Sequence, residues 1–205
     1  MNAYKFRTAD SLDRVTDILM NRRLYCSEIR RLNDIREADI RVGNDRDREV
    51  EVFEFGLTVT RGISQHRVCS LCRIFDNPLL WAHYAGGSSG LAIEVVLPSD
   101  HATEVTYDDD FVFLSEYIDR GVDAAVRAAL ARKTKLWQYE QEVRVVTRTE
   151  FYYLPTPIQR VIVGPRIDQS TLHSLTQVCS EQAIPLQRAI VADRGIYTVG
   201  LQEHA

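Results

Sequence analysis

The chain has few cysteines, no long hydrophobic run and no glycine-rich phosphate loop, and each absence excludes a class of protein. Four cysteines occur among 205 residues, and only Cys69 and Cys72 have the Cys-x-x-Cys spacing. A structural zinc site needs a second such pair, so we expect buried, reduced thiols. No apolar run has the length of a membrane span, and residues 1–7 lack the hydrophobic segment of a signal peptide. We therefore expect a cytoplasmic protein with no membrane partner.

The composition is that of a folded domain. Hydrophobic residues make up 45% of the chain and charged residues 26%, which is enough for a core and excludes general disorder. The length predicts a single domain over residues 1–205, with residues 27–66 as a candidate helical flap or insertion. A net charge of −4 argues against a protein that binds nucleic acid by general electrostatics.

Hydrophobic periodicity predicts helices and strands that alternate without a βαβ rhythm, which favours an α+β fold over a doubly wound one. The predicted strands cover residues 4–7, 67–74, 90–96, 104–107, 141–146, 160–164, 186–191 and 196–201. The predicted helices are one that Asp10 or Ser11 caps, one over 79–85 that Asn77 caps, a long alanine-rich helix over 111–135, and one that Asp168 or Ser170 caps and that ends near Glu181.

Residues 135–146 carry the most informative pattern, an aromatic pair followed by two carboxylates and an apolar run. If this run is a strand from its first acid, Glu140, Glu142 and Arg144 share one face, because side chains alternate with a period of two. Paired acids raise each other's pKa and can divide a chemical task. An edge strand with charges that face solvent or a cross-strand partner is the commoner alternative.

Four short words of sequence resemble an uncharacterised bacterial domain family. They are Tyr-Lys-Phe-Arg at 4–7, Leu-Trp-Ala-His-Tyr-Ala at 80–85, Lys-x-Trp-x-Tyr-Glu-x-Glu-x-Arg at 135–144, and Val-Ile-Val-Gly at 161–164. The resemblance covers nearly the whole chain and implies no particular activity.

The order of the motifs is also similar to that of ADP-ribosyltransferases. Arg7 on an early strand precedes a strand with Ser70, an aromatic helix at 82–85, another strand, and the Glu140-x-Glu142 pair. Ser70 stands alone where arginine-type transferases carry Ser-Thr-Ser. The resemblance implies a single α+β domain with a split mixed or antiparallel sheet, flanking helices and NAD as substrate.

The same resemblance implies roles for individual residues. Glu142 would stabilise the cationic ribose formed when nicotinamide leaves, and Glu140 would activate the acceptor. Arg7, with Lys5 as alternate, would hold the phosphate or the ribose of NAD. The remaining candidates would contact the ribose or stack on a ring, and no metal is required; they are Ser70, Trp81, His83, Tyr84 and Tyr139. A bacterial toxin or defence effector with a neutralising partner fits this family, and the acceptor stays open among protein, nucleic acid and water.

Two other functions fit the residues. Asp108, Asp109 and Asp110 with the two glutamates could bind Mg²⁺ in a nuclease. A sensor or interaction domain would need no catalytic carboxylate, and predicts that both glutamates face solvent with ordinary pKa values. For single residues, ordinary structural roles remain open: an ion pair at Arg7, and core packing of the helical aromatics.

Overall fold

The computed structural model describes residues 1–43, 48–193 and 195–201, and its centre is a mixed nine-stranded sheet. Its strands are β1 (Asn2–Arg7), β3 (Ser27–Glu28), β5 (Arg67–Cys72), β6 (Leu91–Val96), β7 (Thr103–Glu104), β11 (Glu142–Thr147), β13 (Arg160–Val163), β14 (Leu186–Ala192) and β15 (Gly195–Gly200). The order is β15-β14-β13-β6-β1-β5-β11-β7, with β3 against β5. Within the described part of this sheet, only β13 and β14 pair in parallel. The predicted α+β class is confirmed.

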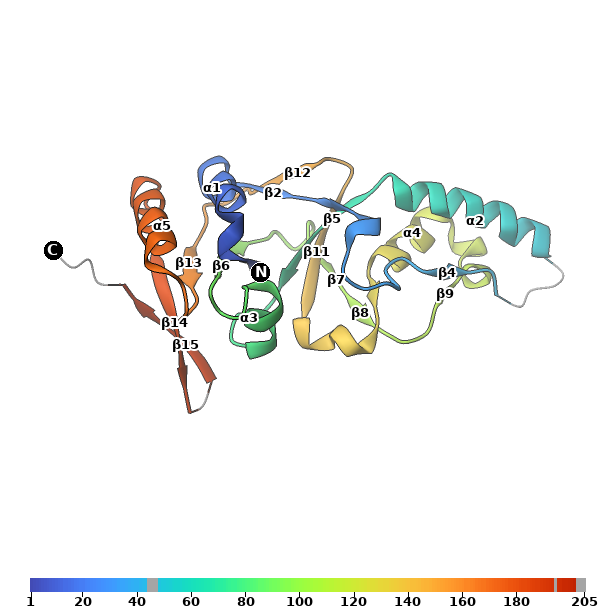
Figure 1. The fold of residues 1–205 in the computed structure, drawn as a ribbon. Coiled ribbons are helices and arrows are strands. Elements are labelled where there is room, and N and C mark those ends of the chain that lie inside the picture. The colour runs from blue at the N-terminus through green and yellow to red at the C-terminus, as the bar shows by residue number, and fades with distance from the viewer. Residues whose placement is uncertain (44–47, 194, 202–205) are drawn as a thin grey trace.

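The described residues include five α-helices. They are α1 (Leu12–Asn21), α2 (Glu49–Ser64), α3 (Pro78–Tyr84), α4 (Val122–Leu130) and α5 (Gln169–Glu181). Figure 1 shows α1 and α5 side by side near the C-terminal strands, and α2 and α4 together at the opposite end of the molecule. Within the described residues, none of the helices combines the length and apolar character needed to cross a membrane.

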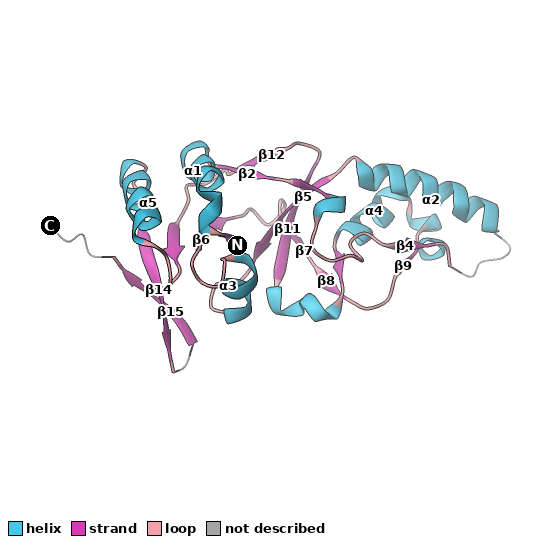
Figure 2. Cartoon of the chain, in the orientation of Figure 1, coloured by secondary structure: helices cyan, strands magenta, loops and turns pink. Residues whose placement is uncertain are grey.

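Three short strand pairs lie outside the main sheet (Figure 2). They are β2 (Arg23–Tyr25) with β12 (Phe151–Tyr153), β4 (Ile40–Arg41) with β9 (Val112–Phe113), and β8 (Thr106–Tyr107) with β10 (Arg132–Lys133). The strand predicted over 104–107 is thus divided between β7 and β8, which pair with different partners.

Local sequence explains where two of the helices begin. The Asn77 side chain accepts a hydrogen bond from the backbone N–H of Leu79 at 2.9 Å, and Pro78 follows at the first helical position. Asp168 accepts from the N–H of Thr171 at 2.9 Å in the same way. Neither side chain predicted to cap α1 does so, because a 3₁₀ turn over Ala9–Ser11 precedes that helix.

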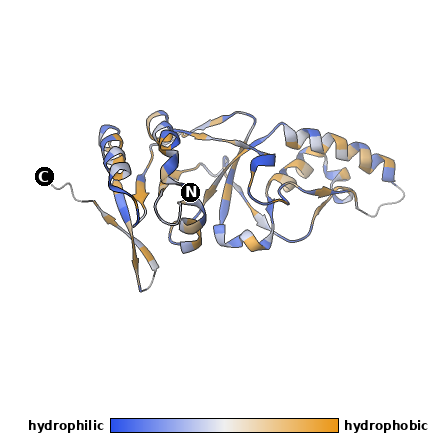
Figure 3. Cartoon of the chain, in the orientation of Figure 1, coloured by the Kyte–Doolittle hydropathy of each residue, from blue (hydrophilic) through white to orange (hydrophobic). Residues whose placement is uncertain are grey.

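Three hydrophobic clusters hold the fold together. The largest joins α1 and α5 to one face of the sheet, and a second packs α3 against the other face. A third lies between α2 and α4. Hydrophilic and hydrophobic residues alternate along these helices (Figure 3), as one buried stripe per helix requires. The four cysteines are free and buried, which confirms the expected thiols: Cys26, Cys69, Cys72 and Cys179.

The sheet is split between β1 and β5. β1 pairs with β6 over six positions, from Asn2 to Arg7, but with β5 only where Tyr4 faces Cys72. On the far side, β5 pairs with β11 over six positions. Beyond Tyr4 the two halves of the sheet therefore separate, and the side chains of Lys5 and Arg7 stand where they part.

The long helix predicted over 111–135 is wrong. α4 is the only α-helix there, after two short 3₁₀ helices over Leu114–Glu116 and Ile118–Arg120. Gly121 in front of α4 has φ +86°, a left-handed conformation that favours glycine. Residues 112–113 pair with β4, and residues 132–133 pair with β8. Lys133 consequently lies on a strand instead of on a helix.

The region 27–66 is helical only in its second half. β3, a 3₁₀ turn over Ile29–Arg31 and β4 come first, and α2 begins at Glu49. Residues 44–47 of this predicted flap lie outside the described residues. The part from Ile29 to Arg41 lies across the buried end of β11, where its side chains contact Lys133, Glu140 and Arg144.

Candidate functional site

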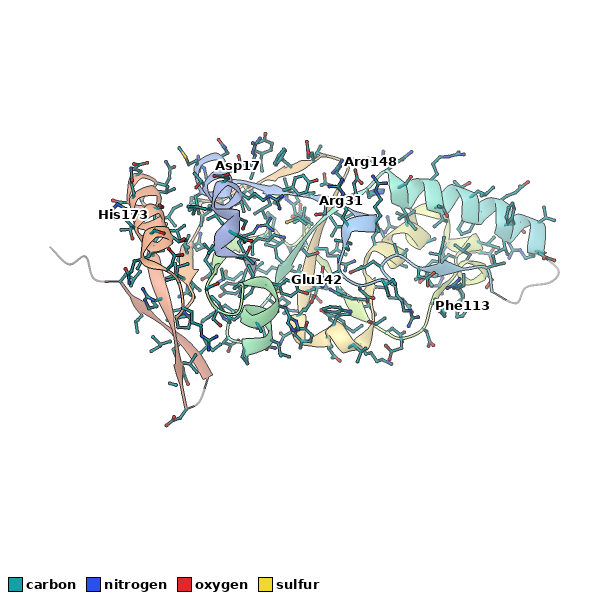
Figure 4. The ribbon with its side chains drawn as sticks, viewed as in Figure 1. Asp17, Arg31, Phe113, Glu142, Arg148 and His173 are labelled. Atoms are coloured by element: carbon teal, nitrogen blue, oxygen red, sulfur yellow. The ribbon has the colours of Figure 1, made fainter. Side chains whose placement is uncertain are left out.

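A cavity of about 200 Å³ lies where the sheet splits. Six of the nine residues predicted for the site line it, and they come from β1, β5, α3 and the segment that leads into β11. Those six are Lys5, Arg7, Ser70, Tyr84, Glu140 and Glu142. In the view of Figure 4, Glu142 lies near the middle of the molecule, with Arg31 above it.

Glu140 and Glu142 lie close together, but not because they alternate along one strand as predicted. β11 begins at Glu142, and Glu140 ends a 3₁₀ helix over Lys135–Glu140. Gln141 between them has φ 43°, so the chain turns at that point. The prediction that both acids lie on one strand face is therefore wrong, and a third residue brings them together. The Lys133 ammonium lies 2.6 Å from Oε2 of Glu140 and 3.0 Å from Oε2 of Glu142.

Arg144 completes a buried charge network behind the cavity. Its Nε donates to Oε1 of Glu142 at 2.8 Å, and its Nη2 donates to Oε1 of Glu37 at 2.8 Å. Its Nη1 donates to the carbonyl of Leu130 at 2.7 Å. The network thus contains three carboxylates and two basic groups, and each of these side chains is at most 4% exposed.

Within the network, the pKa of Glu142 is lowered and the pKa of Glu37 is raised. Burial alone would raise the pKa of Glu142, but Arg144 and Lys133 outweigh it and lower that pKa to about 2. Burial raises the pKa of Glu37 to about 6 although Arg144 opposes this. Oε2 of Glu37 is buried and has no hydrogen-bond partner among the described residues. Glu142 is therefore a fixed negative charge, and Glu37 titrates close to neutrality.

Tyr84 and Asn33 fix the position of Glu140. The Tyr84 hydroxyl donates to Oε1 of Glu140, and the Asn33 amide contacts the same oxygen at 3.4 Å. The Lys133 ammonium also donates to Oδ1 of the Asn33 side chain at 3.1 Å. Burial, followed by this hydrogen bond to Glu140, raises the pKa of Tyr84. Tyr84 is thus a neutral hydroxyl that is hydrogen-bonded to the cavity wall.

Two cations on β1, Lys5 and Arg7, form no ion pair with a carboxylate of the described residues. Lys5 donates to the backbone carbonyl of Ser70 at 2.7 Å. Arg7 makes no hydrogen bond or ion pair with any described residue, and its Nε is buried without a partner. Burial lowers the pKa of both groups. A mostly buried cation without a counter-ion is costly, so this position favours an anionic ligand.

Glycine at position 90 lets β1 come this close to β6. A Cβ on Gly90 would lie 2.1 Å from the carbonyl oxygen of Arg7, a distance that real Cβ atoms do not tolerate. The next residue, Leu91, faces Arg7 in the β1–β6 ladder. The backbone that carries the unpaired guanidinium is therefore held by a close contact that only glycine permits.

Three predicted residues lie away from the cavity. Trp81 is 2% exposed, packs edge-on against Phe6 and donates Nε1 to a backbone carbonyl, so it belongs to the core and offers no free stacking face. His83 and Tyr139 contact each other on the surface, with 2.7 Å between Nδ1 and the hydroxyl. Neither of them lines the cavity.

Four residues of the site were not assigned from the sequence: Asn33, Glu37, Lys133 and Arg144. Asn33 and Glu37 lie in the region with no clear period, and Lys133 was placed in the helix that proved wrong. Arg144 belongs to the specific word at 135–144 and to the predicted charged face. That arginine was the one available signal that Glu142 has a buried cationic partner.

The acidic triplet proposed for a metal lies elsewhere. Asp108 is 3.3 Å from Arg132, and Asp109 accepts a hydrogen bond from the backbone N–H of Lys135 at 3.0 Å. Among residues 1–43, 48–193 and 195–201, no group of three or more His, Cys, Asp or Glu side chains is arranged to hold a metal ion. The glutamates of the cavity face Lys133 and Arg144 instead of these aspartates.

No protein-family model, curated protein or solved structure matches this chain. The functional assignment therefore depends on the chemistry of the cavity itself, on its two carboxylates, its hydroxyls and its unpaired cations.

Proposed function

We propose that this protein binds NAD in the split of its sheet and cleaves the bond between nicotinamide and ribose, as an ADP-ribosyltransferase or NAD glycohydrolase. In this proposal the sheet is an ADP-ribosyltransferase-like split sheet. The observation that carries it is the cavity itself, which gathers Lys5, Arg7, Ser70, Tyr84 and the two glutamates from separate elements. These six residues are among the nine that the motif order predicts for the site.

The charge of Glu142 suits this reaction. When the glycosidic bond breaks, its electron pair leaves with nicotinamide and the ribose carbon becomes cationic. A carboxylate that is ionised at every relevant pH can stabilise that cation without prior proton loss. Arg144 and Lys133 occupy three of the roughly four lone-pair positions of this carboxylate. The Ser70 hydroxyl lies beside the remaining position and helps to lower the pKa of Glu142, so a ribose hydroxyl would bind there together with Ser70.

The other cavity residues have matching tasks. Arg7 and Lys5 would hold phosphate oxygens, which supplies the counter-charge that the protein lacks there. Ser70 would orient the ribose, and Tyr84 would present its ring beside it. Glu140 would orient the acceptor, which is a protein, a nucleic acid or water. A cytoplasmic toxin or defence effector with a neutralising partner is the context that the family resemblance implies.

The rival functions have less support. A magnesium nuclease would need the aspartates near the glutamates, and each set has its own basic partners. A sensor would leave Glu142 exposed with an ordinary pKa, whereas this side chain is 2% exposed and its pKa is about 2.

The decisive experiment is to incubate the protein with NAD and measure nicotinamide release. Glu142→Gln should lower the rate about 100-fold or more, because it removes the preorganised charge. Glu104→Gln is the matched control, since Glu104 lies on neighbouring β7 with a side chain 65% exposed. Circular dichroism would verify that both variants fold, and Ser70→Ala would test the site without removing a buried charge.

Two results would overturn the proposal. The first is an unchanged release rate in folded Glu142→Gln. The second is the absence of release together with the absence of any NAD-induced rise in melting temperature for the wild-type protein, since a bound ligand must stabilise the fold.

A further inference from the structure

A second cavity adjoins the first. It has a volume of about 560 Å³ and lies between α1, β2 and β12. The two cavities share part of their walls, formed by Lys5, Arg7, Ser27 and Arg31. Its volume is in the range of cavities that bind small molecules. None of the roles described above uses this space.

The second cavity has more basic than acidic side chains in its lining: Lys5, Arg7, Arg14 and Arg31 against Asp13 and Asp17. Arg7 has no acceptor among the described residues, and Lys5 has only a neutral carbonyl. Arg31 reaches the same wall and has one ion pair, a long contact of 3.8 Å with Glu28. Groups of this kind bind phosphate oxygens, guanidinium in a bidentate way and ammonium as a point charge.

The outer part of the second cavity adds one more free cation and an aromatic wall. Arg14 of α1 lines the cavity and makes no hydrogen bond or ion pair with any described residue, whereas Asp17 beside it is paired with Arg23 at 2.8 Å. Tyr25 and Phe151 face each other across the β2–β12 pair, with ring centroids 5.9 Å apart. The Arg23 guanidinium covers one face of the Phe151 ring at 4.0 Å from its centroid, so a base would meet the remaining ring surface. Aromatic side chains of this kind contact nucleobases well, because every base has a π-face.

These features appear in the order of the parts of a dinucleotide. The first cavity has carboxylates and hydroxyls suited to a ribose, the shared wall has cations, and the second cavity has an aromatic wall. We infer that the second cavity binds a nucleoside diphosphate group, with its phosphates at Arg7, Arg14 and Arg31 and its base against Tyr25 and Phe151. This inference rests on the proposed function, in which that group is the ADP half of NAD.

Calorimetric titration with ADP tests the second cavity without any cleavage. Arg14→Gln and Phe151→Leu should each weaken ADP binding about tenfold, because each removes one charged or stacking contact. The same variants should leave the binding of nicotinamide mononucleotide unchanged, because that molecule needs only the first cavity and the shared wall. The matched controls are Arg61→Gln, an exposed helical arginine on α2, and Tyr197→Leu, an exposed tyrosine on β15.

The outcomes separate this inference from the proposed function. ADP binding that weakens in Arg14→Gln and Phe151→Leu but not in the controls supports the second cavity, whether or not nicotinamide is released. Release of nicotinamide with ADP binding that is absent, or equal in all variants, would overturn the inference and leave the proposed function standing. If both variants bound nicotinamide mononucleotide as poorly as ADP, the two-cavity assignment would be wrong.

Discussion

The Arg144 guanidinium is 1% exposed and lies between two carboxylates, Glu142 and Glu37. Replacing it by methionine keeps the length of the side chain but leaves both acids buried without their strongest partner. We expect Arg144→Met to lower the free energy of unfolding by about 3–5 kcal/mol. Urea titration would measure the loss, with Arg73→Met as control, because the Arg73–Glu104 pair is half exposed and contributes under about 1 kcal/mol. Equal losses in the two variants would refute the buried network.

Glu37 gives a pH-dependent prediction at the same scale. Its pKa is raised by burial from 4.5 to about 6 in the folded protein, so the folded state holds the proton more tightly than the unfolded state. Its contribution to stability is complete below about pH 4.5 and is lost as the pH rises through 6. The difference of about 1.5 pKa units corresponds to about 2 kcal/mol.

Comparison with Glu37→Gln isolates this titration. The stability advantage of the wild-type protein over the variant should shrink by about 2 kcal/mol between pH 4 and pH 7. Urea unfolding at both pH values would measure it, and Glu54→Gln on the exposed face of α2 should show no such change. A constant difference between wild type and Glu37→Gln would mean that Glu37 has an ordinary pKa.

Among the strands and helices, β1 depends on one glycine. A Cβ at position 90 would have to displace the Arg7 carbonyl, which is 2.1 Å away, and therefore the end of β1. We expect Gly90→Ala to lower the free energy of unfolding by roughly 1–3 kcal/mol. The affinity for NAD should fall by more than this loss of stability alone would cause. Thermal melting and titration would measure both effects. Gly200→Ala, where nothing lies within 4 Å, should change neither of them.

The elements also show what the sequence could predict. Strong periodicity and local caps predict β1, α3, β6, β13 and α5 within a few residues, because the side chains of each segment determine whether it forms a helix or a strand. The helix over 111–135 failed because its alanines have good helix propensity, while Gly121 and two short strand pairings override that propensity. Strand pairing between distant segments leaves no local signal.

The residues of the site also divide into those that a local pattern predicts and those that only tertiary contacts bring together. The acids, Ser70 and the β1 cations could be selected from motif order, since each lies in a segment with a clear pattern. Lys133 and Glu37 could not, because tertiary contacts alone bring them to β11. The turn at Gln141, with φ 43°, was equally hidden, since a non-glycine residue rarely adopts it. The buried charge network is therefore the part of this molecule that the sequence alone does not predict.

For the whole molecule, the cavity at the split of the sheet is lined by segments that lie far apart in the chain. The segment from Ile29 to Glu37 reaches the site through single side chains, such as Asn33 at Glu140 and Glu37 at Arg144. Its Asp34 accepts a hydrogen bond from the Thr134 N–H at 3.1 Å. Segments held in this way open locally with less free energy than the sheet does.

Bound ligand should suppress that opening. If the site closes only when residues 29–37 are in place, ADP-ribose at about 100 times its Kd should slow amide hydrogen exchange there about 100-fold, because binding stabilises the closed form by about 2.7 kcal/mol. Hydrogen-exchange mass spectrometry would measure it, with the β14–β15 hairpin as internal control, since neither cavity includes it. Protection spread equally over the hairpin would indicate general stabilisation. Protection absent from residues 29–37 would show that this segment does not help to close the site.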